Sequence, residues 1–178
     1  MADDAQLIES SDDRKSAVSA TEAPSEANGF LSSHVAMMAR SCLRLAGLHL
    51  LSEYAFELSA AEFAQSVFEA KFALVSHNTN SDPIFNYANR TALNLFEMTW
   101  EEFTALPSRL SAEPVHRDER ARLMAQVREK GFISDYSGVR ISKFGRRFCI
   151  HEATVFNLED EGGKPCGQAA LFSNWTEL

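Results

Sequence analysis

The stretch DPIFNYANRTALNLFEMTWEEF, residues Asp82–Phe103, decides the fold. Its proline-led run at 84–87 has the composition of a short strand. Asn89 is a preferred N-cap residue and begins a short helix. Thr99 and Glu102 have the spacing of a capping box, which begins a second helix. This dense succession predicts a small fold that turns a sharp corner between a sheet and its helices.

Upstream of this stretch, the sequence predicts two helices and a strand. Val35–Leu51 fits an amphipathic helix whose apolar face requires cover, either on the back of a sheet or on a second copy of the chain. Ser59 and Glu62 form another capping box and begin the second helix. Phe72–Ser76 has the composition of a short buried strand.

Downstream, a helix is predicted over Val115–Lys130, with Gly131 as its left-handed cap. The remaining residues form three runs rich in β-branched and aromatic residues, separated by turns with Gly, which predicts an antiparallel meander. A slip in the apolar alternation predicts a bulge around His151–Glu152. The fold class is therefore α+β: a five-stranded antiparallel sheet with helices on one face, preceded by N-terminal helices.

Charge and composition exclude several classes of function. The net charge is −8, and residues 1–30 hold much of the acidic excess with little bulky apolar material, so we expect a disordered acidic tail there. The rest of the chain is nearly neutral, which argues against nucleic-acid binding. It has no apolar run that predicts a membrane span, no secretory signal pattern and no paired cysteine motif. We therefore expect a cytoplasmic protein without membrane or nucleic-acid partners.

Several blocks of the sequence resemble the MEKHLA domain, a branch of the PAS fold. They are SHNTNSDPIFNYANRTALNLFEMTWEEF, PSRLSAEP, DYSGVRIS, GRRF and GQAALFS. The resemblance runs from about Leu48 to Trp175, and we expect residues 31–71 to be a helical extension and 72–178 the PAS-like domain. It implies a sensory or interaction module, similar to the stand-alone form of a domain also found at the C-terminus of plant class III homeodomain–leucine-zipper proteins, where it is linked to dimerisation.

The resemblance also frames which cofactors to consider. A PAS photosensor that forms a cysteinyl–flavin adduct has a reactive Cys in the region that here has the sequence SAEPVHRDERARL, which contains none. Non-covalent flavin binding stays open. A haem PAS domain requires an axial His, for which only His116 is placed on the long helix, and its charged neighbours favour a solvated side chain.

Metal and enzyme chemistry have weaker signals. His77, Asn78 and Asp82 share one loop, but a turn held by Asn and Asp side chains explains them better than metal binding. The chain has neither a GxSxG motif nor a Gly-rich phosphate loop. Glu113 or Glu152 is a candidate base only in a closed pocket, so we expect a protein that is not an enzyme.

A further set of polar residues is predicted to point inward without an obvious partner. We expect them either to form a hydrogen-bonded network that locks the loop PSRLSAEP to the sheet, or to bind a ligand that the sequence does not name. They are Asn86, Tyr87, Trp100, Arg109, Tyr136, Arg140 and Gln168. Two main hypotheses follow. The first is a sensory module that binds a small ligand and a protein partner or a second copy. The second is a dimerisation or partner-binding domain with a filled core, with an enzyme as a third alternative.

Overall fold

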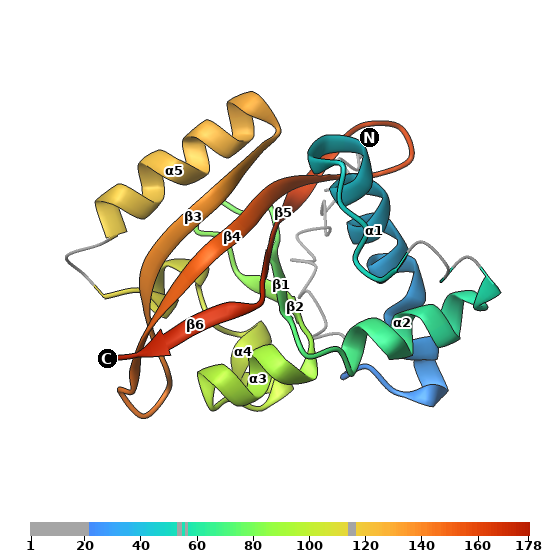
Figure 1. The fold of residues 1–178 in the computed structure, drawn as a ribbon, viewed down its shortest axis with the longest axis horizontal. Coiled ribbons are helices and arrows are strands. Elements are labelled where there is room, and N and C mark those ends of the chain that lie inside the picture. The colour runs from blue at the N-terminus through green and yellow to red at the C-terminus, as the bar shows by residue number, and fades with distance from the viewer. Residues whose placement is uncertain (1–21, 53–54, 56, 114–116) are drawn as a thin grey trace, which may run out of the picture.

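An antiparallel sheet with helices against both faces organises the chain (Figure 1). The computed structural model describes residues 22–52, 55, 57–113 and 117–178. The main strands lie in the spatial order β2-β1-β5-β4-β3, which confirms the predicted sheet of two early strands and a C-terminal meander. The strands are β1 (Ala73–His77), β2 (Phe85–Ala88), β3 (Phe132–Ile141), β4 (Arg147–Glu159), β5 (Pro165–Phe172) and β6 (Asn174–Glu177).

The sixth strand is an extension of the fifth. Thr154 of β4 faces Leu171 of β5, and three residues along β4, His151 faces Asn174 of β6 in the same register. β5 and β6 therefore act as one strand along β4, interrupted after Phe172. The predicted five-stranded sheet is present, with its last strand in two parts.

The predicted bulge in β4 is confirmed. Tyr136 of β3 pairs with Ala153, and Gly138 pairs with Ile150, so two residues of β4 lie opposite a single residue of β3. One of those two residues, Glu152, has a φ of 51°, which is the kind of local backbone distortion that a bulge introduces.

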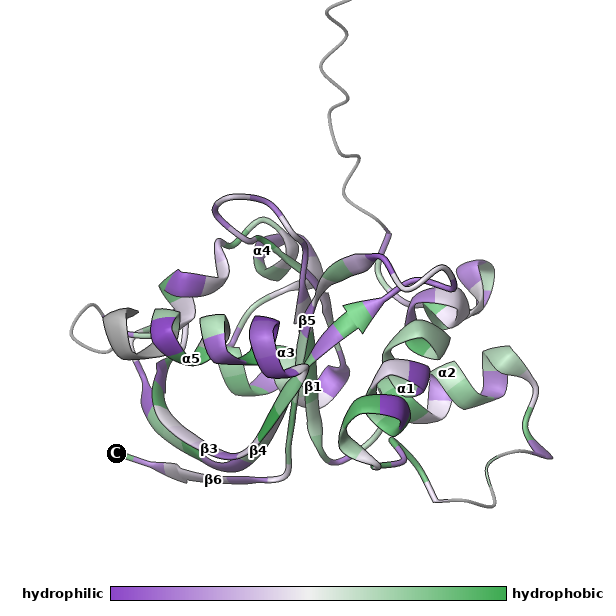
Figure 2. Cartoon of the chain, turned by 90° about the horizontal axis from the view of Figure 1, so that it is seen from above, coloured by the Kyte–Doolittle hydropathy of each residue, from purple (hydrophilic) through white to green (hydrophobic). Residues whose placement is uncertain are grey.

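The helices form two layers, one on each face of the sheet. We call the side that carries α3, α4 and α5 the front face and the side that carries α1 and α2 the back face; Figure 2 shows the two groups separated by the strands. The helices are η1 (Glu26–Leu31), α1 (Ser32–Ala46), α2 (Ala60–Phe68), α3 (Arg90–Phe96), α4 (Trp100–Thr104), η3 (Ser108–Ser111) and α5 (Arg117–Lys130).

Side-chain caps position the helices as the sequence predicts. Ser59 and Glu62 form the capping box of α2, and Thr99 and Glu102 form that of α4. The Asn89 side chain accepts a 3.1 Å hydrogen bond from the backbone N–H of Ala92, which caps α3, and another from the N–H of Leu74. Asn89 thus fixes the helix start to the first strand of the sheet.

Helix α1 covers the back of its own sheet. It ends at Ala46, earlier than the predicted end at Leu51, because Gly47 (φ 68°) takes the left-handed cap conformation. Val35, Met38 and Cys42 are fully buried in the cluster between this helix and the sheet. The apolar face of the helix is therefore occupied within the chain, which removes the reason for expecting a dimer through it.

The segment that precedes α1 is also part of the fold. Residues 22–30 fall inside the tail that we expected to be disordered, yet η1 packs Phe30 against Phe68 of α2 at a ring-centroid distance of 6.1 Å. The Asn28 side chain stabilises this turn, because it accepts from the N–H of Ser25 and donates to the carbonyl of Ala23. Residues 1–21 lie outside the described residues, as do Pro114–His116 before α5. None of the described helices is long and apolar enough to cross a membrane.

Candidate functional site

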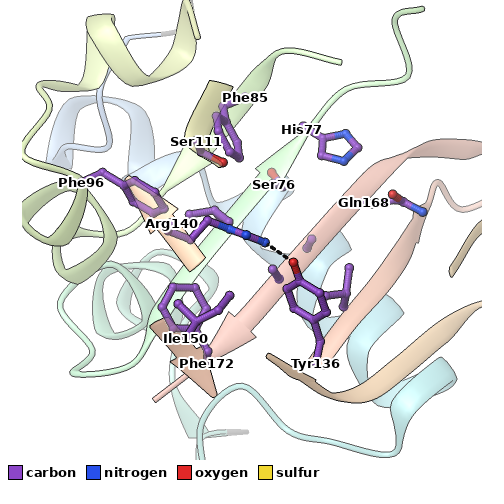
Figure 3. Close-up of a pocket in the computed structure, with 14 residues that line it drawn as sticks. Ser76, His77, Phe85, Phe96, Ser111, Tyr136, Arg140, Ile150, Gln168 and Phe172 are labelled. Atoms are coloured by element: carbon purple, nitrogen blue, oxygen red, sulfur yellow. Dashed lines mark hydrogen bonds between the residues drawn. The ribbon is translucent and has the colours of Figure 1, made fainter. Parts of the chain in front are cut away.

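A cavity lies between the front face of the sheet and the helical layer above it (Figure 3). The volume open to the centres of water-sized molecules is about 40 Å³. One part of its wall is apolar and comes from Phe85, Phe96, Ile150 and Phe172, among others. Polar side chains gather on the rest of the wall: His77, Ser111, Tyr136, Arg140 and Gln168, and Ser76 also borders the cavity.

Arg140 crosses the middle of this cavity from β3 (Figure 3). Arg140 is only 8% exposed to solvent. Nη2 donates a 2.7 Å hydrogen bond to the Tyr136 hydroxyl, and Nη1 donates a 2.9 Å bond to the carbonyl of Val139. Among the described residues no carboxylate pairs with this guanidinium, so a positive charge is buried here without an opposite charge.

Gly138 makes the contact between Tyr136 and Arg140 possible. The three residues alternate along β3, so they share one face of the sheet. A Cβ atom at Gly138 would lie 2.6 Å from the Tyr136 hydroxyl and 3.3 Å from Arg140 Nη1. The Tyr136 ring therefore lies over a position without a side chain, and the guanidinium carbon of Arg140 lies 5.2 Å from the ring centroid.

The other polar side chains of the wall are anchored by neighbours. His77, at the end of β1, has Nδ1 within 2.8 Å of the carbonyl of Asn78. The Ser111 hydroxyl donates to the carbonyl of Ser108 at 2.7 Å. Gln168 Nε2 donates to Asn157 Oδ1 at 3.1 Å. These contacts hold the three side chains in place at the rim of the cavity.

A second polar group lies on the back face, below α1. Ser76 of β1 faces Tyr87 of β2, and His77 faces Phe85, so Asn86 is an extra residue in β2. The Ser76 hydroxyl donates to Asn86 Oδ1 at 2.7 Å and lies 2.9 Å from Nε2 of His34. Burial lowers the pKa of His34 to about 4, so its imidazole is neutral at physiological pH.

Tyr87 belongs to this back-face group, and the Trp100 side chain of α4 packs against it. The Tyr87 ring stacks on His34 at a centroid distance of 5.7 Å and meets the edge of Trp100 at 6.0 Å. The Tyr87 hydroxyl is buried without a hydrogen-bond partner among the described residues, and burial raises its pKa well above the usual value.

Arg109 lies outside the cavity, on an open groove beside it. Its guanidinium binds Asp82 through two hydrogen bonds of 3.0 and 3.1 Å, and both side chains are about half exposed. The groove has about 430 Å³ open to the centres of water-sized molecules and shares His77 and Gln168 with the cavity. Solvent screens such an exposed ion pair, so we assign Arg109 to the structure of this loop and not to ligand binding in the cavity.

The structure thus divides the residues that the sequence singles out. Tyr136, Arg140 and Gln168 come together in the cavity, whereas Asn86 and Tyr87 lie on the back face, Trp100 of α4 packs in the same cluster as Tyr87, and Arg109 lies on the groove. The polar cavity residues Ser76, His77 and Ser111 were not included among the predicted site residues. Their position in the sequence could have indicated two of these residues, because His77 ends a buried strand and Ser111 is part of the loop PSRLSAEP.

The metal and base candidates do not gather into a site in the described part of the chain. No group of three or more His, Cys, Asp or Glu side chains there could hold a metal ion. Glu113 pairs with Arg147, and Glu152 is exposed and accepts from Asn174 at 2.7 Å. The haem candidate His116 lies outside the described residues.

Two solved PAS domains are similar to this structure. A PAS domain from Colwellia psychrerythraea superposes with a TM-score of 0.55 at 14% identity, covering 66% of this chain and 94% of that one. A PAS domain from a two-component sensor histidine kinase gives a TM-score of 0.51 at 18% identity, covering 66% and 95%. At these identities the likeness shows the fold, which confirms the PAS-like architecture.

The sequence itself is similar to a plant protein. The chain is 30% identical over 105 residues to the homeobox-leucine zipper protein ATHB-14 of Arabidopsis thaliana, which is 57% of this chain and 12% of that protein's length. The MEKHLA domain profile matches residues 32–177, including α1 and α2. Because this match spans most of the chain, the protein belongs to the MEKHLA domain family.

Proposed function

We propose that this protein is a sensory module that binds a small ligand in the front-face cavity and passes the signal on through a protein contact. One observation carries the proposal: Arg140 is 8% exposed, reaches into the cavity and has no carboxylate partner among the described residues. Burying a charge without a counter-charge is costly. A ligand that supplied the missing counter-charge would offset this cost.

The fold supports a sensory role. The PAS fold places a cavity between sheet and helices, and one structural neighbour is a PAS domain from a two-component sensor histidine kinase. The relative ATHB-14 is a homeobox-leucine zipper protein, which favours a regulatory setting over an enzymatic one. We accordingly propose a non-enzymatic module of the cytoplasm whose output is a protein partner or a second copy of this chain.

The back face offers a path for that output. Gln168 in the cavity wall binds Asn157 of β4. Two residues further along β4, the Glu159 backbone N–H donates to Ser41 Oγ of α1 at 3.2 Å, and the Glu159 carboxylate pairs with Arg44 of the same helix. A ligand that moves Gln168 would therefore act on the strand that holds α1 in place.

A partner-binding domain with a filled core is the second candidate. The small cavity volume of about 40 Å³ favours it. So does the close packing of aromatic rings beside the cavity, where Phe85 stacks on Phe103 at 4.3 Å and Phe96 meets Phe148 at 5.2 Å. In this alternative the Arg140–Tyr136 contact is only a link in the core.

Purified protein separates the two candidates. Its native mass is compared with its denatured mass, its visible absorbance is recorded, and its melting temperature is followed across a panel of metabolites. A bound mass or a saturable rise in melting temperature supports a ligand-sensing module. Equal masses together with an unchanged melting temperature would contradict it and favour the filled core.

A cavity-filling variant provides the control. Ala170 lies in the cavity wall on β5, and Ala170→Val adds volume there. This change is expected to remove any ligand-induced rise in melting temperature. Ala105→Val adds the same groups at an exposed position after α4 and is expected to keep the rise.

A further inference from the structure

We infer that the ligand of the front-face cavity is a short-chain carboxylate whose carboxyl group binds Arg140. This inference rests on the proposed function and names the chemical class of the ligand. Hydrogen-bond donors on one side of the cavity and an apolar wall on the other side support this assignment.

The guanidinium of Arg140 has unused hydrogen-bond donors. An Arg side chain carries about five N–H donors in a planar fork. The hydrogen bonds to Val139 and Tyr136 use one donor on each terminal nitrogen, and no other bond to the described residues is made. The remaining N–H groups and the positive charge match a carboxylate, which Arg binds through two parallel hydrogen bonds.

The Tyr136 hydroxyl supplies a further donor. Its oxygen accepts from Arg140 Nη2, so its own hydrogen is available to a second acceptor. Tyr136 is only 6% exposed, and the hydroxyl has no acceptor among the described residues. A carboxylate oxygen beside Arg140 would accept hydrogen bonds from both the guanidinium and the Tyr136 hydroxyl and would neutralise the positive charge. The oxygen of a neutral amide would accept the same bonds but would leave the charge of Arg140 without a counter-charge.

Among the described residues, no acidic side chain of the front layer pairs with Arg140. Glu97, which follows α3, accepts from Ser142 and pairs with Arg146. Glu113, which follows η3, pairs with Arg147. Glu102 of α4 pairs with Lys143. These three described carboxylates are thus engaged elsewhere, which leaves the charge of Arg140 to a ligand.

The rest of the cavity sets the size and polarity of that ligand. The opposite wall is made of Phe85, Phe96, Ile150 and Phe172, which suits a hydrocarbon tail. A volume of about 40 Å³ on this measure accommodates about three water-sized groups. Because bonded atoms lie closer together than separate waters do, an acid as small as acetate or propionate fits, whereas phosphate would leave oxygens unsatisfied against the apolar wall.

Matched acids and amides test the inference. Wild-type protein is titrated with acetate and propionate, and separately with acetamide and propionamide, at constant ionic strength, by calorimetry and by melting temperature. We expect saturable binding of the acids with a rise in melting temperature, and at least tenfold weaker binding of the amides. Phosphate and nitrate serve as inorganic anions and are expected not to saturate.

Two variants localise the effect. Arg140→Met is expected to lose the response to propionate, and Tyr136→Phe is expected to weaken it severalfold while keeping the preference for acid over amide. Arg90→Met removes an exposed cation on α3 and is expected to bind as the wild type does. Circular dichroism establishes that each variant is folded.

The outcomes separate this inference from the function on which it rests. Equal binding of acids and amides, binding of inorganic anions alone, or binding that survives Arg140→Met would overturn the carboxylate assignment and leave ligand sensing intact. If none of these probes binds but the metabolite panel yields a neutral ligand, the carboxylate assignment also fails. If nothing in either set binds, both proposals fail.

Discussion

The Tyr136 hydroxyl accepts a 2.7 Å hydrogen bond from Arg140 Nη2 inside a cavity where neither residue is more than 8% exposed. The bond joins two residues of one strand across Gly138, whose missing side chain leaves room for it. A strand usually directs such a long cation to solvent. Here it directs the cation beneath the helical layer, and the central claim of the account depends on that placement.

Removing this pair is expected to stabilise the ligand-free protein. In the double variant Tyr136→Phe/Arg140→Met, apolar side chains of similar size replace a buried charge and its acceptor, so the free energy of unfolding should rise by about 1 kcal/mol or more. Tyr136→Phe alone should lower it by about 1–3 kcal/mol, because Arg140 loses an acceptor. Urea unfolding of the four proteins of this cycle measures both values. A double variant less stable than either single variant would mean that the pair is a structural link.

Stability is expected to fall in mild acid because of His34. The pKa of His34 is lowered from 6.5 to about 4 by burial, so the unfolded chain binds a proton at a pH where the folded chain does not. His34 therefore leaves the free energy of unfolding unchanged above pH 6.5. As the pH falls from 6.5 towards 4, the free energy of unfolding decreases, and the loss reaches about 2 kcal/mol at pH 5. Unfolding free energies measured from pH 7.5 to 5 report it.

Two His variants assign this pH dependence. His34→Phe keeps a ring against Tyr87 but cannot take up a proton, so its stability should change less between pH 6.5 and 5 than that of the wild type. His49→Phe alters an exposed His after α1 and should leave the dependence unchanged. If His34→Phe retained the full wild-type slope, another group would be responsible.

Tyr87→Phe is expected to leave the protein as stable as the wild type or to raise its stability by about 1 kcal/mol. The hydroxyl that it removes is buried without a partner among the described residues, so its loss relieves an unmet desolvation cost. Thermal and urea unfolding measure the change. A loss of more than about 1 kcal/mol would show that the hydroxyl has a bound partner.

Gly167→Ala is expected to destabilise the sheet by about 3 kcal/mol or more. Its φ is 146°, and a Cβ atom would lie 1.9 Å from the carbonyl oxygen of His77, so β1 and β5 would have to separate. Gly162→Ala, in the turn between β4 and β5, meets no backbone atom within 4 Å and should cost much less. Similar losses in the two variants would contradict the close approach at Gly167.

Much of the fold could be predicted because its signals are local. Capping boxes depend on residues three apart, as at Thr99 and Glu102, and these placed the helix starts correctly. The bulge at His151–Glu152 showed in the alternation of a single strand. The end of α1 was harder to predict, because an apolar pattern continued to Leu51 although Gly47 stops the helix.

The cavity was only partly predictable because it depends on long-range pairing. Tyr136 and Arg140 share a face of β3 by simple alternation, so the sequence could place them together. In β2 the extra residue Asn86 disrupts that alternation and directs Tyr87 to the back face. The inclusion of His77 depends on how β1 pairs with β5, which no local pattern reveals.

The most direct test of the account observes the Arg140 guanidinium itself. In nitrogen-15-labelled protein, the Nε–Hε signal of Arg140 is assigned by its loss in Arg140→Met and is then followed while propionate or propionamide is added. Propionate is expected to shift this signal saturably, with the same affinity that calorimetry gives, and propionamide is expected to leave it in place. A signal unmoved by propionate, or moved equally by propionamide, would contradict the carboxylate assignment.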